Sequence, residues 1–264
     1  MGRKVCLRQA LANIIQPLIL NLKQREFIHL NTRAILFDLD GTLIDSTDLV
    51  LQCFRHSWES VVGFYHSREA LLQTFGTPLR AAMHRLLSTS QDASEGMHSQ
   101  AREVSADYLI DQLLASYRAF NSANHDKLAR PFEGISDVLK ELRRRGYLIG
   151  VVTSKGRDLA LRGLRLCALE GLIDSAIFLE DTEVHKPSPE PILAALKNLS
   201  RPCETAAYVG DSPHDIAAAR AAGVLSVAAL WGPASRIELE RENPDLIAES
   251  IGDLLEIFDR SAQV

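Results

Sequence analysis

Short apolar runs alternate with amphipathic helical segments along most of the chain, from Arg33 onward. The apolar runs favour strands, and the strands expected are 34–37, 148–152, 176–179, 206–209 and 226–230. Helical spacing of apolar residues predicts helices over 135–145, 157–167, 190–199 and 216–222, with Gly146, Gly171 and Gly223 at positions where helices end. Strands without polar alternation are typical of a parallel sheet that is buried on both faces. The pattern therefore predicts an α/β fold in which helices cover a parallel sheet.

One stretch, from about Asp48 to Arg130, departs from this alternation. It shows helical periodicity and polar connections but no convincing strand, and residues 88–96 have the composition of a loop. Open α/β sheets bind ligands at the carboxyl ends of their strands. Because the stretch leaves the sheet at that edge, we expect it to cover the site as a helical lid. The expected organisation is a core domain of 33–46 and 131–264 with a helical cap domain of 47–130.

Residues 1–32 are expected to form a separate amphipathic extension. Apolar residues recur at helical spacing from Leu7 to Leu22 between basic flanks, and Pro17 interrupts the run. No stretch reaches the roughly 20 apolar residues of a membrane-spanning helix, and no small-residue cleavage site follows the run. The pattern favours a short helix that docks on a neighbour, or an upstream start site. A membrane-surface or targeting role is the alternative.

Composition and charge argue against several kinds of partner. The 264 residues are 46% hydrophobic and 24% charged, with a net charge of −5. A mildly acidic chain has no electrostatic footprint for nucleic acid, and an anionic substrate would need local positive charge. The four cysteines are scattered without a CxxC pair. This spacing favours reduced thiols and a cytoplasmic location over a disulfide framework or a zinc site.

Four polar clusters follow the expected strands, at the edge where the strands end. They are Asp38-Leu39-Asp40-Gly41-Thr42, Thr153-Ser154-Lys155, Lys186-Pro187 and Gly210-Asp211-Ser212-Pro213-His214-Asp215. Two carboxylates held close together, as in the first cluster, repel each other unless one is protonated, paired or bound to a cation. A Mg²⁺ ion satisfies this requirement and leaves one aspartate free to attack phosphorus. Each cluster alone is an ordinary strand-end connection, and only their shared sheet edge makes the set specific.

In this order, the four clusters resemble the motifs of the haloacid dehalogenase-like hydrolase superfamily. The resemblance covers the chain from Arg33 to its last residue. It implies a Rossmann-like, three-layer α/β/α core with a parallel sheet, an inserted all-helical cap and a hydrolase activity. The segments 184–191 and 211–219 are similar to the phosphoglycolate phosphatase and pyrophosphatase branch of this superfamily.

The resemblance also implies the roles of three reacting residues. Asp38 would be the nucleophile that forms an aspartyl-phosphate. Asp40 would protonate the leaving oxygen and then deprotonate the attacking water, a double role that needs a pKa near neutrality. Lys186 would neutralise charge on the nucleophile and on the phosphoryl oxygens. The alternative for the aspartate pair is a turn or a helix cap.

Mg²⁺ is the cofactor that the resemblance implies, because this ion prefers oxygen ligands and bridges protein to substrate phosphate. Its ligands would be the Asp38 carboxylate, the Asp40 backbone carbonyl and the Asp211 carboxylate. Asp215 would reach the surroundings of the metal or pair with the motif lysine, and Ser212 would hydrogen-bond within the same turn. The alternative for Asp215 is a carboxylate at a helix N-terminus, where the helix dipole favours it.

On the core, the substrate-binding residues implied by the resemblance follow the first two strands. Thr153 would donate its hydroxyl, and Ser154 its backbone N–H, to the transferring phosphoryl group. Lys155 would add positive charge at the substrate, or it would be a solvated turn residue. Thr42 is also expected at the substrate, and together with Gly41 it allows the tight turn below the metal.

The cap sets substrate choice in this superfamily, and its sequence is less decisive. Residues 76–80 resemble the cap loop that reaches toward the site, and residues 117–126 resemble the end of the cap in pyrophosphatase-type members. Arg118, Asn121 and His125 are therefore candidates for binding a distal phosphate. A polar helix face that packs on the core domain is the alternative for each of the three.

Small departures separate the activities found in this superfamily. Dehalogenases lack the second aspartate, and transport ATPases carry Lys-Thr where this chain has Leu39-Asp40. We therefore expect a Mg²⁺-dependent phosphatase that acts on a small phosphorylated metabolite similar to phosphoglycolate, or on inorganic pyrophosphate. The alternatives are a sugar phosphomutase and a regulatory or binding module that uses the N-terminal helix. The sequence leaves the oligomeric state open, a homodimer included.

Overall fold

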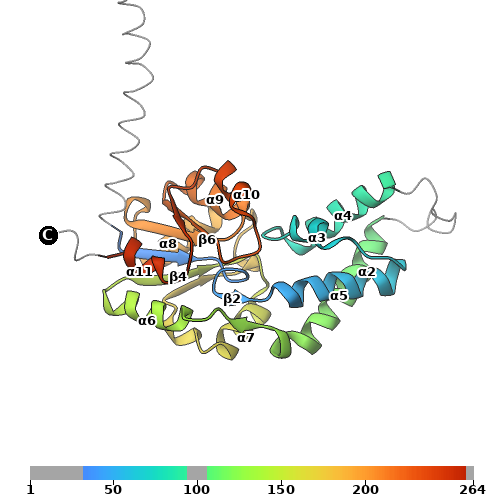
Figure 1. Ribbon diagram of the computed structural model, residues 1–264, viewed down its shortest axis with the longest axis horizontal. Helices are drawn as coiled ribbons and strands as arrows, with labels where there is room; N and C mark the ends of the chain where they lie inside the picture. The colour runs from blue at the N-terminus through green and yellow to red at the C-terminus, as the bar shows by residue number, and fades with distance from the viewer. Residues whose placement is uncertain (1–31, 94–105, 260–264) are drawn as a thin grey trace, which may run out of the picture.

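The computed structural model describes residues 32–93 and 106–259. At its centre lies a six-stranded parallel sheet with the order β5-β4-β1-β6-β7-β8 (Figure 1). The strands are β1 (Ala34–Phe37), β4 (Leu148–Val152), β5 (Ser175–Ile177), β6 (Ala206–Gly210), β7 (Leu225–Ala229) and β8 (Leu246–Ala248). In the middle of the sheet, Phe37 pairs with Val151 on one side and Val209 on the other. The predicted α/β fold with a parallel sheet is confirmed.

Helices cover both faces of this sheet and make three layers. Helices α8 and α9 pack on one face, with α10 beside α9, while α6 packs on the other face with α11 beside it (Figure 1). The helices of the core are α6 (Ile135–Arg144), α7 (Arg157–Leu166), α8 (Glu190–Leu199), α9 (Pro213–Ala222), α10 (Arg236–Arg241) and α11 (Asp253–Ile257). Three single turns of 3₁₀-helix, η2 (Glu170–Leu172), η3 (Leu179–Asp181) and η4 (Cys203–Thr205), lie in the connections.

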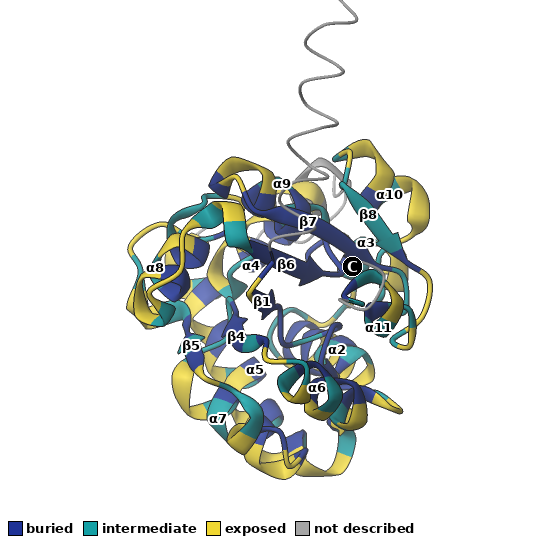
Figure 2. Cartoon of the chain, turned by 90° about the vertical axis from the view of Figure 1, so that its left-hand side faces the viewer, coloured by how far each residue is buried: buried dark blue, intermediate teal, exposed yellow. Residues whose placement is uncertain are grey.

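Strand β1 has this position because none of its side chains is polar. Ala34 and Leu36 pack into the apolar layer under α8 and α9, while Ile35 and Phe37 pack into the layer on the opposite face. All four side chains are fully buried. Burying a side chain of the size of Ile, Leu or Phe contributes about 1.5–3 kcal/mol. Figure 2 shows the result, a buried sheet inside helices whose outer faces are exposed. The residue that follows β1 is thereby fixed at the carboxyl edge of the sheet.

The helical insertion lies beyond that carboxyl edge, as the sequence predicts (Figure 1). It consists of α2 (Thr47–Val62), α3 (Arg68–Leu72), α4 (Leu79–Ala93) and α5 (Ala106–Leu128), and α2 and α5 pack along each other. Two short antiparallel strands, β2 (Ile44–Asp45) and β3 (Arg130–Pro131), carry the chain out and back. The exact division into a core and a cap domain stays a prediction.

Several local expectations differ from the structure. Helix α4 continues to Ala93, so the first part of the expected loop 88–96 is helical. Gly146 and Gly223 have positive φ angles after α6 and α9, but Gly171 lies inside η2, and Ala168 takes the left-handed conformation after α7 instead. Residues 1–31 of the expected N-terminal extension lie outside the described residues. Within the described part of the chain, no helix is long and apolar enough to cross a membrane.

Candidate active site

Asp38, the residue directly after β1, lies in a buried charged cluster. Lys186 Nζ donates to Asp38 Oδ1 at 2.8 Å and to Asp215 Oδ1 at 2.6 Å. The Tyr208 hydroxyl, from β6, lies 3.1 Å from the same nitrogen. All four side chains are buried. Although burial lowers the pKa of Lys186, the carboxylates of Asp215 and Asp38 outweigh it and hold that pKa well above its usual value. The lysine therefore stays charged between two carboxylates.

Two carboxyl groups of this region, Asp38 and Asp211, have raised pKa values. Burial raises the pKa of Asp38 to about 7, Lys186 opposes the shift, and the charge of Asp215 adds to it. Burial also raises the pKa of Asp211 well above its usual value, and the charges of Asp38 and Asp215 contribute. Neighbouring acids that resist ionisation in this way form a site where a bound cation would lower the free energy of the ionised state.

Three of these carboxyl groups lie close enough together to hold a metal ion. One oxygen each from Asp38, Asp211 and Asp215 lies within 4.8 Å of the others. Asp215 already uses both oxygens, because Oδ1 accepts from Lys186 and Oδ2 accepts from the backbone N–H (3.0 Å) and the hydroxyl (2.5 Å) of Ser212. Asp38 and Asp211 therefore remain as carboxylate ligands. An all-oxygen donor set of this kind fits Mg²⁺.

The local sequence explains why Asp215 and Ser212 take these positions. Ser212 is the N-cap of α9, its hydroxyl accepts from the Asp215 N–H, and Pro213 fills the first helical turn. This capping box orients Asp215 toward Lys186 while it begins the helix. The helix-capping alternative and the predicted pairing with the lysine are therefore both present in one residue.

Gly41 allows the turn after β1 to pass directly over Asp211. Its φ angle is +89°, and a Cβ at this position would lie 2.3 Å from Asp211 Oδ2. Only glycine combines this backbone conformation with so close an approach. Thr42, next in the chain, donates its hydroxyl to Asp211 Oδ1 at 2.6 Å. The turn thus fixes the Asp211 carboxylate through the close approach of Gly41 and the hydrogen bond from Thr42.

We expect Gly41→Ala to weaken Mg²⁺ binding as well as stability. The left-handed backbone alone costs an L-residue on the order of 1–3 kcal/mol. The added methyl group must also displace Asp211 Oδ2, which Mg²⁺ would need. Gly63→Ala is the matched control, because Gly63 has a φ angle of +85° and nothing within 4 Å of an added Cβ. Thermal unfolding with and without Mg²⁺ checks this prediction; equal Mg²⁺-induced shifts in both variants would contradict it.

Asp40 points into the cavity and is held by two donors on one oxygen. Lys155 Nζ lies 2.9 Å and Ser46 Oγ 2.6 Å from Asp40 Oδ1. Burial raises the pKa of Asp40, but the charge of Lys155 and the hydrogen bonds from Ser46 and Lys155 outweigh it and lower that pKa below its usual value. The near-neutral pKa expected for an acid/base residue is therefore absent in this arrangement. Lys155 lies at the site as predicted, but paired with Asp40.

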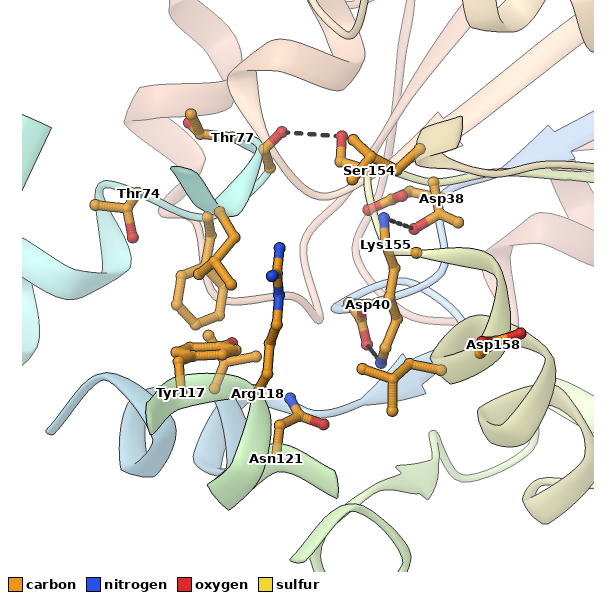
Figure 3. A pocket seen from close by; sticks show the side chains of 18 of the residues that line it. Asp38, Asp40, Thr74, Thr77, Tyr117, Arg118, Asn121, Ser154, Lys155 and Asp158 are labelled. Carbon is orange, nitrogen blue, oxygen red and sulfur yellow. Dashed lines mark hydrogen bonds and ion pairs between the residues drawn. The ribbon is translucent and has the colours of Figure 1, made fainter. Parts of the chain in front are cut away.

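A cavity of about 630 Å³ lies above these residues, between the core and the helical insertion. Asp38, Asp40, Lys186 and the segment Thr153–Lys155 line its core side. Thr153 is buried, and its hydroxyl oxygen accepts from the Lys155 N–H at 3.1 Å, which leaves its proton free to donate. Ser154 Oγ donates to the Gly76 carbonyl at 3.4 Å, so the cap loop contacts the core at the cavity (Figure 3). The cap loop therefore reaches the site as its sequence suggests.

The three cap candidates differ in where they lie. Arg118 and Asn121, from α5, line the cavity, and Arg118 points into it (Figure 3). His125 does not line it; the ring is fully buried, its Nδ1 lies 3.0 Å from Asp126 Oδ1, and it approaches Gly163 of α7. His125 shares a helix face with Arg118 but lies about 10 Å further along the axis, which takes it past the cavity.

Thr42 lies elsewhere than expected, and two residues that the sequence did not indicate lie at the site. Thr42 was expected at the substrate, but its side chain is fully buried on Asp211 and does not line the cavity. Tyr208 contacts Lys186, and Ser46 contacts Asp40, yet neither was predicted at the site. A lone tyrosine among the small residues of β6 was the available signal for Tyr208. Ser46 had none beyond its closeness to Asp40 in the chain.

Comparisons with known proteins agree with this geometry. Residues 35–229 match the family model described as haloacid dehalogenase-like hydrolase. A protein of Caldanaerobacter subterraneus subsp. tengcongensis, provisionally named pyrophosphatase PpaX, is 40% identical over 85% of this chain and 94% of its own length. Pyrophosphatase PpaX of Anoxybacillus flavithermus is 35% identical over 87% and 98%. A solved structure from Haemophilus somnus 129pt, described as a predicted phosphoglycolate phosphatase, has the same fold, with a TM-score of 0.77, 21% identity and coverage of 87% and 99%.

Proposed function

The chain belongs to the haloacid dehalogenase-like hydrolase family, and we propose that it is a Mg²⁺-dependent phosphatase that works through an aspartyl-phosphate on Asp38. One observation carries this proposal: Asp38 lines the cavity, while Lys186 holds one of its oxygens and Asp211 lies beside it. Such an arrangement neutralises the charge that otherwise keeps a carboxylate from attacking a phosphate.

Each residue around the phosphoryl group has a separate role in the proposed reaction. Asp38 attacks phosphorus, and Lys186 offsets the negative charge on both reactants. The Thr153 hydroxyl and the Ser154 N–H bind the phosphoryl oxygens. Asp40 protonates the leaving oxygen and then takes a proton from water. An anionic substrate competes with Asp40 for Lys155, and loss of that ion pair raises the pKa of Asp40 toward the range that acid catalysis needs.

Mg²⁺ would be held by the carboxylates of Asp38 and Asp211 and by the backbone carbonyl of Asp40. Bound there, the ion would neutralise phosphate charge and orient the phosphoryl group. Asp215 and Ser212 stand behind these ligands and fix the position of Lys186 and of the turn. Thr42 fixes one oxygen of Asp211.

We expect Mg²⁺ to raise the melting temperature, and a chelator to abolish turnover. Binding to the folded state alone stabilises a protein by about 2.7 kcal/mol at a ligand concentration 100 times Kd. Because the pKa values of Asp38 and Asp211 are raised, protons compete with the metal, and the shift should grow from about pH 5 to about pH 8. Asp211→Asn should lose most of the shift. Thermal unfolding against Mg²⁺ concentration measures this shift, and Asp137→Asn, at an exposed ion pair with Lys140, is the control.

Two kinds of substrate agree with this proposal, a phosphoric anhydride and a phosphate monoester. The names of the bacterial relatives favour inorganic pyrophosphate, and the name of the solved structure favours phosphoglycolate. Stoichiometric release of free phosphate from either substrate would exclude the phosphomutase alternative, since a mutase retains the phosphoryl group. The proposal includes a cytoplasmic location, because the scattered cysteines favour reduced thiols. It is compatible with a homodimer.

A further inference from the structure

Apolar and polar residues of the cap both line the cavity, and the polar ones are Thr74, Thr77, Arg118, Asn121 and Ser122. The apolar ones form one wall, which consists of Val50 and Phe54 from α2, Phe75 and Leu79 from the cap loop and the start of α4, and Tyr117 from α5. The rings of Phe54 and Tyr117 pack edge to face, with centroids 5.1 Å apart. Figure 3 shows Tyr117 on the side of the cavity opposite Asp40 and Lys155. The polar residues of the core therefore face an aromatic and aliphatic wall.

This wall is larger than the reaction on Asp38 requires. A transferring phosphoryl group occupies only the core end, near Asp38, Thr153 and Lys186. The whole cavity measures about 630 Å³, within the range of about 300–1,000 Å³ that buries a drug-sized organic ligand. Pyrophosphate is charged and hydrated over its whole surface, and placing such a group against apolar side chains costs free energy without return. The wall matches the carbon skeleton of an organic substrate.

The same region holds one cation that no carboxylate neutralises. Four cationic side chains line the cavity: Arg118, Lys155, Arg162 and Lys186. Lys155 is paired with Asp40, Arg162 with Asp126, and Lys186 with Asp38 and Asp215. The Arg118 side chain has no ion pair or hydrogen bond to another described residue, and it points into the cavity beside Tyr117 (Figure 3). Two further carboxylates, Asp158 and Glu180, line the cavity, and Glu180 accepts from the Arg157 N–H.

We propose that the substrate is a phosphate monoester of an organic compound whose apolar segment of several carbons packs on this wall and whose second anionic group binds Arg118. Planar guanidinium groups bind carboxylates and phosphates through two parallel hydrogen bonds, so either anion fits at that end. The inference rests on the proposed function, since it assumes that the phosphoryl group lies on Asp38. It keeps the proposed phosphatase reaction but departs from both substrates that the names of the relatives suggest, because neither pyrophosphate nor phosphoglycolate has an apolar segment of several carbons.

A homologous series of substrates tests the proposal on the wild-type protein. Esters of phosphate with ω-hydroxy carboxylic acids are compared, from phosphoglycolate upward by one methylene at a time, together with pyrophosphate and the matching alkyl phosphates. We expect kcat/KM to rise about fourfold for each methylene until the wall is covered, which corresponds to about 0.8 kcal/mol per buried methylene. Pyrophosphate should be the poorest substrate. A kcat/KM that is highest for pyrophosphate or phosphoglycolate, and falls with length, would overturn the proposal.

Two variants separate the wall from the cation. Arg118→Met should lower kcat/KM for the carboxylate esters about 10- to 100-fold more than for the alkyl phosphates, the loss expected for hydrogen bonds to a charged group. Phe75→Ala should flatten the dependence on chain length. Arg55→Met and Ile237→Ala, at exposed residues outside the cavity, are the controls.

The outcomes also separate this proposal from the one on which it rests. If the wild-type protein hydrolyses none of these compounds with Mg²⁺, the phosphatase proposal fails and this one fails with it. If it hydrolyses them with the reverse order, or if Arg118→Met affects both series equally, only the substrate class is wrong.

Discussion

Asp38→Asn is expected to lower kcat by at least about 10⁴-fold, the loss typical of removing a catalytic nucleophile. Asparagine has nearly the same shape, but its amide oxygen is neutral and does not form an aspartyl-phosphate. The fold should persist, because Lys186 keeps Asp215 as a buried carboxylate partner. Release of phosphate from pyrophosphate and from an aryl phosphate measures the loss. Acid quenching with labelled substrate should trap protein-bound phosphate in the wild type and none in the variant.

Asp137→Asn is the matched control for this variant. Its side chain on α6 is exposed and, among the residues that the structure describes, pairs only with Lys140 at 3.2 Å, so the same charge is removed without any contact to the cavity. Its turnover should equal that of the wild type. Activity of Asp38→Asn within about tenfold of the control would be incompatible with a nucleophilic role.

The local pattern of apolar residues predicts the strands and helices of the core well. It fails for strands that are very short. β1 and α8 are found at their predicted positions because four buried apolar residues, or a helical repeat, carry their own signal. β8 is a three-residue edge strand, and β2 and β3 have two residues each. Such elements exist because a neighbour offers hydrogen bonds, which no local period records.

The site divides in the same way. Asp38, Lys186 and Asp211 could be predicted because each follows a strand of one parallel sheet, and the edge of that sheet brings them together. The pairing of Asp40 with Lys155 depends on side-chain directions across two loops. The position of His125 depends on where α5 passes the cavity. These are properties of packing, and the motifs alone do not contain them.

Of the substitutions considered, Lys186→Met is expected to lower the stability of the fold most. It should also abolish activity. Nζ is the donor to both Asp38 and Asp215, and the side chain is 2% exposed. Breaking a buried ion pair by removing one partner costs about 3–5 kcal/mol. For a protein of this size such a loss lowers Tm by roughly 10 °C. Thermal unfolding in the presence of a chelator, so that no metal compensates the carboxylates, measures the effect.

The loss of stability in Lys186→Met should also depend on pH, and the pKa of Asp38 determines whether it grows or shrinks as pH rises. Its pKa is already raised to about 7 by burial, and Lys186 opposes that rise, so removing the lysine raises it further. A carboxyl group whose pKa is higher in the folded than in the unfolded state destabilises the fold progressively as pH rises from about 4 through the folded pKa. The difference in Tm from the wild type should therefore be small near pH 4 and grow toward pH 8. Lys140→Met, at an exposed pair, should unfold like the wild type throughout. A deficit that shrinks as pH rises would show that lost packing, and not the buried carboxylates, accounts for the instability.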